Sequence, residues 1–185
     1  PAPSPNSTQV LWTDRGTCVL FGDGAGAAVL KAEETGVEDM LMGSDGTKGP
    51  ILSCTSRTLG NFLTGTKPEL GLMTMDGQEV FRFAVKKVPE SIEILLERNH
   101  ISREEIKYYV LHQANERIVE AAARRLKEPM EKFPMTISKY GNTSSASIPL
   151  LLNDMAEKKM LQPGDKIILS GFGAGMTWGA VLMEW

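Results

Sequence analysis

Cysteine and histidine are scarce in this chain, which contains two of each among its 185 residues. Cys18 and Cys54 have neither the spacing of a zinc site nor the number needed for a disulfide framework. Two histidines cannot form a multi-histidine cluster either. A structural or catalytic zinc ion is therefore not expected, and we assign no metal ligand.

Long apolar runs are also missing, since no stretch approaches the roughly 18 apolar residues of a membrane-spanning helix. The opening residues, Pro1 to Ser7, carry neither the basic nor the apolar region of a secretion signal. These absences favour a cytoplasmic protein. The net charge of −3 leaves no general excess of basic residues, which argues against a nucleic-acid partner.

The chain does have a globular composition, with 42% hydrophobic residues, at a length that suits one well-buried core. Residues 1–11 contain three prolines and several small polar residues, so we expect them to form a flexible arm. One domain is expected over residues 12–185.

Apolar periodicity along this domain predicts an α/β fold with a mixed sheet, because helical and strand patterns alternate. Strands are expected over residues 17–21, 27–32, 37–44, 108–111, 166–170 and 177–184, and the first two resemble a hairpin. Helices are expected over 78–99, 116–127 and 143–159. Asp76 and Asn115 are suited to cap the first two helices, and Pro89 is expected to kink the first or to start another. Residues 46–71 are expected to form a long loop.

Three short segments carry polar groups at the predicted ends of these elements, namely residues 111–115, 140–144 and 171–179. His112 ends a strand, Asn142 precedes a helix, and the third segment is a glycine-rich loop, so all three could meet at one rim of the sheet. Such hydrogen-bond donors suit a reaction in which negative charge develops on a carbonyl oxygen. Taken singly, each has a structural interpretation as a core histidine, a helix cap and a hairpin turn.

Other motifs have weaker functional interpretations. The glycine run 22–26 lacks the third glycine of the dinucleotide fingerprint, which favours a structural hairpin over a nucleotide loop. Cys18 lies in a predicted strand and Cys54 in a polar loop, and neither position is typical of an activated thiolate. The arginines of helix 116–127 are expected to lie on a solvated surface, with docking of an acidic partner as the alternative.

Together these motifs resemble the C-terminal half of β-ketoacyl-acyl carrier protein synthase III, the initiating condensing enzyme of bacterial fatty-acid synthesis in the thiolase superfamily. The resemblance runs from about Trp12 to the end of the chain, and its motifs are LFGDGAGA, GQEVF, HQANER, GNTS and GFGAGMTWG. The His–Asn pair differs from the two histidines of the elongating enzymes and from thiolases. Plant-type polyketide synthases share the pair, but the last motif resembles the bacterial initiator.

The resemblance implies a thiolase-like half-domain, with a mixed five-stranded sheet and helices on its faces. It implies that His112 and Asn142 hold the thioester oxygen of a malonyl group and that the N–H of Ala174 helps to form a second oxyanion hole. It implies substrate and coenzyme A contacts for Gln78, Phe81, Ala114, Asn115 and Phe172. It implies acyl carrier protein contacts for Arg117, Arg124 and Arg125.

The resemblance also implies an acyltransferase that condenses an acyl-coenzyme A starter with malonyl-acyl carrier protein, without a metal or redox cofactor and as a homodimer when intact. In this family the nucleophilic cysteine belongs to an N-terminal half that this chain does not contain, so the chain alone is expected to be inactive and to need that half as a partner. Two alternatives stay open. One is a non-catalytic module that binds carrier protein or coenzyme A, and the other is a new nucleophile at Cys54.

Overall fold

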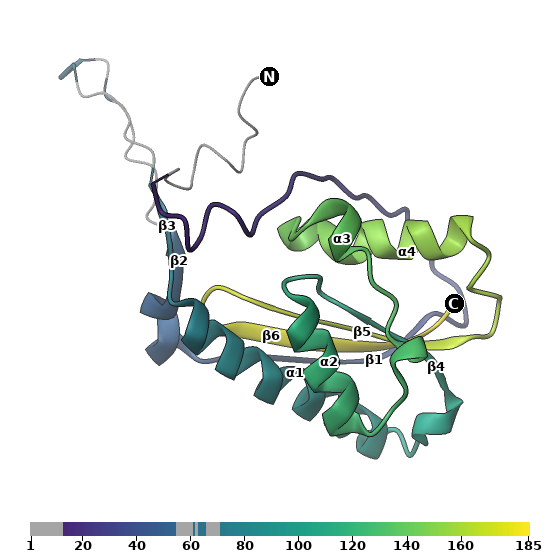
Figure 1. The fold of residues 1–185 in the computed structure, drawn as a ribbon. Helices are drawn as coiled ribbons and strands as arrows, with labels where there is room; N and C mark the ends of the chain where they lie inside the picture. Colours follow the sequence, from purple (N-terminus) through teal and green to yellow (C-terminus); the bar gives the residue numbers. More distant parts are fainter. Residues whose placement is uncertain (1–12, 55–60, 62, 66–70) are drawn as a thin grey trace.

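The computed structural model describes residues 13–54, 61, 63–65 and 71–185 and has three layers, with a mixed sheet between two layers of helices (Figure 1). The sheet has the strand order β1-β6-β5-β4. Its strands are β1 (Val37–Ser44), β4 (Ile106–Leu111), β5 (Lys166–Gly173) and β6 (Thr177–Glu184). Strands β4 and β5 are parallel, whereas β6 is antiparallel to both of its neighbours. The predicted α/β class with a mixed sheet is confirmed.

Helices α1 (Gly77–Arg98) and α2 (Glu116–Leu126) cover one face of the sheet (Figure 1). Tyr109 and Leu111 of β4 point to this face and pack with Ile92 and Leu95 of α1. Since successive side chains of a strand alternate between faces, Val110 points the other way. Burial of apolar side chains on both faces fixes the register of the central strands.

Helix α1 begins where the sequence predicts, because the Asp76 carboxylate accepts hydrogen bonds from the backbone N–H groups of Gln78 and Glu79. The helix then continues through Pro89, so the prediction of a second helix starting there is wrong. Pro89 is buried between Val88 and Ser91 on the core side. We attribute the continuity to this packing, which offsets the lost backbone hydrogen bond.

Helices α3 (Ile137–Tyr140) and α4 (Ser147–Glu157) cover the opposite face (Figure 1). Leu151 and Met155 of α4 pack there with Val110 and Ile167. The predicted helix 143–159 is thus divided into a 3₁₀ turn, Ser144–Ala146, followed by α4. Pro149 lies in the first turn of α4, where a backbone N–H would have no helical partner in any case.

The predicted hairpin over 17–32 is wrong. Residues 13–20 form turns, and the segment that follows is extended without belonging to either sheet of the described residues. Its glycines lie close to the α4 layer, with Gly24 near Thr143 and Gly26 near Pro149. Local alternation predicts an extended backbone, but strand pairing requires a neighbouring strand, and β6 pairs with β1 instead. The described sheet therefore has four strands, not the expected five.

The stretch 46–71 contains more structure than the loop that the sequence predicts. A 3₁₀ helix (Gly46–Ile51) leads into β2 (Leu52–Cys54), which pairs antiparallel with β3 (Met73–Met75). The remainder of this loop is only partly described, and the expected arm 1–11 lies outside the described residues. Among the helices of the described chain, none is long and apolar enough to cross a membrane.

Candidate active site

His112 follows directly after β4, at the carboxyl end of this strand. Its backbone N–H donates to the carbonyl oxygen of Ser170 on β5, at 2.8 Å. The imidazole ring meets the ring of Phe172 edge-on, with the centroids 5.4 Å apart, and its Nδ1 atom lies 2.6 Å from the Ser147 hydroxyl oxygen. Burial lowers the pKa of His112 to about 4. The ring is therefore neutral at neutral pH and can act as a hydrogen-bond donor without carrying charge.

Asn142 lies between Gly141 and the 3₁₀ turn that precedes α4. The Asn142 side-chain oxygen accepts a hydrogen bond from the backbone N–H of Ser144, at 2.9 Å. This contact orients the carboxamide, and its NH₂ group makes no hydrogen bond to any described residue. Asn142 can thus donate N–H to a ligand.

The backbone of Asn142 is held by the segment that the sequence had suggested as a hairpin. Asn142 forms a parallel bridge with Phe21, and the Gly22 N–H donates to the Asn142 carbonyl oxygen at 2.8 Å. A Cβ atom on Gly22 would lie only 1.9 Å from the carbonyl oxygen of Tyr140. Glycine is thus required here for a close approach of two backbones, rather than for a nucleotide.

The loop between β5 and β6 supplies a backbone donor. The N–H of Ala174 makes no hydrogen bond within the described part of the chain, while its carbonyl oxygen accepts one from the Thr177 hydroxyl at 3.0 Å. Ala174 is not among the residues with positive φ, so the backbone accommodates its methyl group. The loop can therefore present an N–H to an oxyanion.

His112, Asn142 and Ala174 all line one cavity of about 230 Å³. The predicted convergence of the three segments is thus confirmed. The cavity has mostly apolar walls, formed by Leu20, Phe21, Leu52, Met73, Met75, Val80, Phe81, Ile118 and Phe172. A mostly apolar cavity with a few convergent donors is typical of a site for a small-molecule substrate.

The expected substrate contacts divide into two groups. Phe81, Ala114, Asn115 and Phe172 line the cavity. Gln78 does not, because its side chain is exposed in the first turn of α1, next to the lining residue Gly77.

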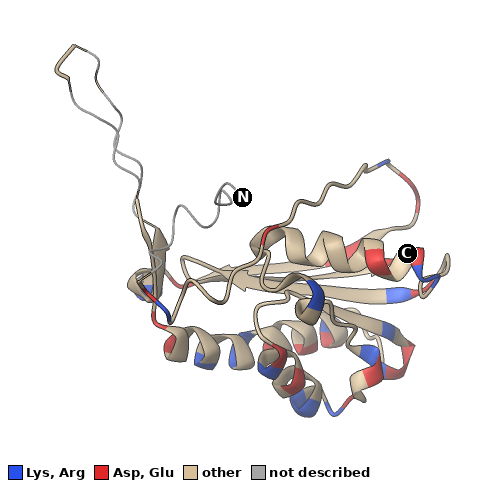
Figure 2. Ribbon diagram, turned by 45° about the horizontal axis from the view of Figure 1, so that its top comes forward, with Lys and Arg blue, Asp and Glu red and all other residues tan. Residues whose placement is uncertain are grey.

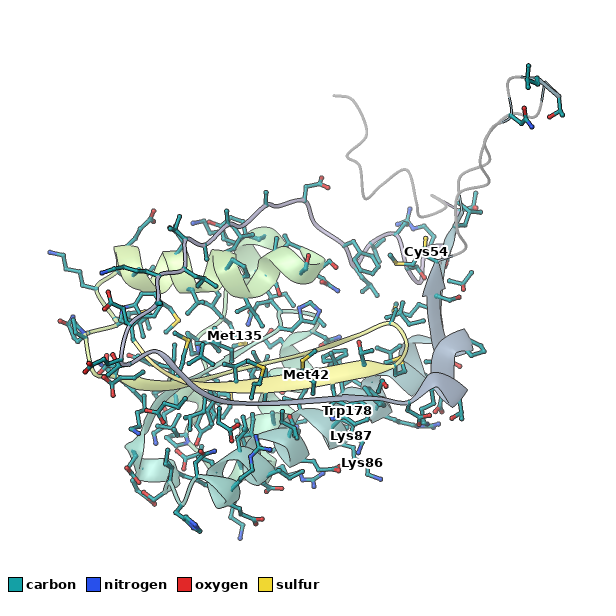
Figure 3. The ribbon with its side chains drawn as sticks, turned by 180° about the vertical axis from the view of Figure 1, so that it is seen from behind. Met42, Cys54, Lys86, Lys87, Met135 and Trp178 are labelled. Carbon is teal, nitrogen blue, oxygen red and sulfur yellow. The ribbon has the colours of Figure 1, made fainter. Side chains whose placement is uncertain are left out.

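The sequence did not predict the contribution of the β2–β3 ribbon, which adds Cys54, Met73 and Met75 to the cavity. Figure 3 shows Cys54 at the end of β2. The short alternating segments LSC and MTM are the only local signal for this ribbon, and the long connection between them hid their pairing. The bridge between Phe21 and Asn142 was also not predicted, because the two residues are far apart in the sequence.

A second, more open cavity of about 600 Å³ shares His112, Ser144, Phe172 and Gly173 with the first. Its other lining residues include Met42, Ser147 and Trp178. Trp178 is fixed from α1, since the Lys87 ammonium lies 4.7 Å from its ring centroid (Figure 3). The His112 and Phe172 side chains can therefore be approached from two cavities.

Charged residues are frequent on α1 and α2, where the ribbon in Figure 2 is coloured blue for Lys and Arg and red for Asp and Glu. Arg117, Arg124 and Arg125 are exposed on α2. Arg124 lies 3.6 Å from Glu120, as the sequence predicts, and Arg125 lies 3.8 Å from Glu93. The Arg117 guanidinium forms no ion pair with a described residue. Arg117 is two residues from Asn115, which lines the cavity, so this cation is close to the cavity in the sequence.

The fold belongs to the thiolase-like class, as two solved structures show. The crystal structure of 3-oxoacyl-acyl-carrier-protein synthase III from Aquifex aeolicus VF5 matches with a TM-score of 0.83 and 36% identity, over 97% of this chain and 55% of that chain. The synthase III structure from Thermus thermophilus matches with a TM-score of 0.82 and 35% identity, over 97% of this chain and 56% of that chain.

The sequence agrees with these structures. Residues 96–185 match the family model for the C-terminal part of 3-oxoacyl-acyl-carrier-protein synthase III, and residues 3–46 match the model named for synthase III itself. The β-ketoacyl-acyl-carrier-protein synthase III of Clostridium novyi (strain NT) is 49% identical over 181 residues, which cover 97% of this chain and 56% of that protein. The chain belongs to the β-ketoacyl-acyl-carrier-protein synthase III family. It spans a little over half the length of the curated relatives it matches.

Proposed function

We propose that this chain forms the carbanion-stabilising part of a β-ketoacyl-acyl carrier protein synthase III, which condenses an acyl-coenzyme A starter with malonyl-acyl carrier protein. The observation that carries the proposal is the pair of side-chain donors, His112 and Asn142, at one apolar cavity. Family membership supports the reaction class, and the geometry of the donors supports their roles.

In the proposed first step, both side chains donate N–H groups to the thioester oxygen of the malonyl group. The bond between the α-carbon and the carboxylate breaks, carbon dioxide leaves, and the electron pair moves into an enolate whose oxygen carries the charge. Donors that are already oriented stabilise this charge without reorganisation. A neutral His112 suits this role, because it donates a hydrogen bond without having to lose its proton to the enolate.

In the second step, the enolate carbon attacks the thioester carbonyl of an acyl group on a cysteine. The oxygen of this carbonyl becomes negative, and the Ala174 N–H would donate to it, together with the N–H of that cysteine. Collapse of this intermediate expels the thiolate and leaves the β-ketoacyl product on the carrier. These steps use N–H donors alone, so the proposal includes no metal or redox cofactor.

We assign the nucleophilic cysteine to a homologous N-terminal half, and not to the 185 residues of this chain. Cys18 is half-buried among the turns of residues 13–20, and Cys54 is exposed on β2. Neither lies at the N-terminus of a helix in the part of the chain that the structure describes, where a thiol would be activated. The chain alone is then inactive in condensation, and the intact enzyme is a homodimer in this proposal.

The carrier protein is proposed to dock on the arginines of α2. Arg117, Arg124 and Arg125 present exposed guanidinium groups, and the first of them is next to the cavity that would receive the pantetheine arm. Phe81, Ala114 and Asn115 would line the path of that arm. Positive charge beside the entrance attracts an acidic carrier and orients it.

Intact mass spectrometry after incubation with acetyl-coenzyme A tests this assignment, with and without a separately produced N-terminal half. We expect an acetyl adduct only on the added half, with condensation restored in the mixture. An adduct on this chain alone would place the nucleophile at Cys18 or Cys54, and its loss in Cys54→Ser would identify the latter. Binding of carrier protein without turnover in the mixture would instead favour a non-catalytic binding module.

A further inference from the structure

We propose that Ser147 is a positioning residue that fixes the tautomer of His112, so that the ring proton stays on Nε2. This inference deepens the proposed function and rests on it for its purpose, because only the Nε2–H tautomer donates from Nε2 to a thioester oxygen. The hydrogen-bond geometry around Ser147 carries the argument.

The Ser147 hydroxyl has two partners among the described residues. Its oxygen lies 2.6 Å from His112 Nδ1 and 3.3 Å from the backbone nitrogen of Gln113. A backbone N–H can only donate, so the hydroxyl oxygen is the acceptor from Gln113. Ser147 is only 2% exposed, which makes it costly for the hydroxyl hydrogen to have no acceptor. His112 Nδ1 is the acceptor in reach, and it accepts only when it carries no proton.

Gln113 holds this arrangement in place. The residue is 1% exposed, and its side chain donates to the Leu111 carbonyl oxygen at 2.8 Å and accepts from the Thr136 N–H at 3.0 Å. These contacts anchor the backbone turn whose N–H points at Ser147. The Ser147 oxygen accepts from the Gln113 N–H, so the hydroxyl hydrogen points away from Gln113. It then points toward the imidazole and donates to Nδ1.

The ring itself is held from other directions. The His112 backbone is bonded to Ser170 of β5, and Phe172 packs edge-on against the ring. The opposite tautomer would direct a lone pair of Nε2 at the thioester oxygen, where two acceptors repel each other. Since a single hydrogen bond can decide between two neutral tautomers, Ser147 has a large effect on the donor in the cavity.

The tautomer can be measured on the chain without any substrate. Two-bond ¹H–¹⁵N correlation spectra of ¹⁵N-histidine-labelled protein distinguish protonated from unprotonated ring nitrogens. The chain has only two histidines, and exposed His100 serves as an internal reference. We expect His112 to show a protonated Nε2 and an unprotonated, hydrogen-bonded Nδ1 at neutral pH. A protonated Nδ1 in the wild type would overturn the proposal outright.

Ser147→Ala tests the cause. We expect the two nitrogen shifts of His112 to move toward the average of both tautomers. The matched control is Ser170→Ala, which keeps the backbone carbonyl that accepts from His112 and removes only a hydroxyl that is 2% exposed and donates to the Gly179 carbonyl oxygen. It should leave the His112 pattern unchanged. If Ser147→Ala does not fold, Ser147→Cys keeps a similar size with a much weaker donor.

Two outcomes contradict the role of Ser147. One is an unchanged His112 spectrum in the folded Ser147 variant, and the other is an equal change in Ser170→Ala, which would indicate a general packing effect. Because the spectra need neither a nucleophile nor a carrier, they remain decisive if the proposed condensation fails.

Discussion

The backbone N–H of Gly22 donates to the carbonyl oxygen of Asn142 at 2.8 Å. This contact joins a segment near the beginning of the described chain to a residue that lines the cavity. The close approach of the two backbones leaves no space for a side chain at residue 22.

Gly22→Ala is expected to displace this segment and to lower the free energy of unfolding by about 1–3 kcal/mol, because the new methyl group would meet the Tyr140 carbonyl oxygen. The position of Asn142 should change with it, so decarboxylation of malonyl-acyl carrier protein by the reconstituted enzyme should fall. Gly46→Ala is the control, since nothing lies within 4 Å of its added Cβ. Urea unfolding and carbon dioxide release measure both effects, and equal behaviour of the two variants would argue against the contact.

Removal of either side-chain donor should slow decarboxylation in the mixture with an N-terminal half. We expect His112→Ala and Asn142→Ala each to lower kcat by about 100- to 1,000-fold, the usual cost of losing one oxyanion donor. Affinity for carrier protein should be retained, since α2 is untouched. Asn153→Ala, which removes an exposed amide bonded to Glu157, should have no effect on rate. A loss of carrier binding together with rate would contradict the assigned roles.

Burial of His112 predicts how stability depends on pH. The pKa of His112 is lowered from 6.5 to about 4, so between these values the unfolded chain takes up a proton that the native protein does not. Protonation of the unfolded chain therefore lowers the free energy of unfolding as the pH falls from 6.5 toward 4, by about 3 kcal/mol in total. Above pH 6.5 this group causes no loss of stability.

Urea unfolding of the wild type and of His112→Gln at several pH values measures this contribution. The difference in unfolding free energy should be largest near pH 7 and should shrink toward pH 4, while the carboxylates titrate similarly in both proteins. A difference that stays constant over this range would show that the ring is not protonated more easily in the unfolded state.

Charge reversal on α2 should weaken the binding of an acidic carrier protein. We expect Arg117→Glu to lower affinity by about tenfold or more at low salt and by less at high salt, because the attraction between exposed charges is screened. Lys159→Glu makes the same change in net charge on the side of α4, at an exposed position. Titration monitored by calorimetry compares them, and equal losses would mean that only net charge matters.

Parts of the fold with a strong local pattern could be predicted from the sequence. Strand β1 has the predicted bounds, and α1 begins after the predicted cap at Asp76. The patterns of the short β2 and β3 strands are too brief to identify, because their pairing depends on a distant partner. The prediction of a hairpin over residues 17–32 was wrong for a related reason. Alternation of apolar and polar residues indicates an extended backbone but does not identify the strand with which it pairs.

The position of the site was predictable because His112 and Asn142 each border a regular element. The predicted order of strands and helices was enough to expect both residues at one rim of the sheet. The sequence did not indicate Ser147, whose contact with His112 depends on how α4 packs over the sheet. The roles of these residues in catalysis stay predictions until the variants above are measured.

Val29 and Leu30 lie fully exposed on extended backbone. An apolar segment of this kind offers its N–H and C=O groups to any other strand that comes near, and the risk of sheet-like aggregation rises with protein concentration. We therefore expect light scattering at high protein concentration to depend on this short stretch. Val29→Lys or Val29→Glu should lower this scattering, and residue 29 does not line the cavity that contains His112 and Asn142.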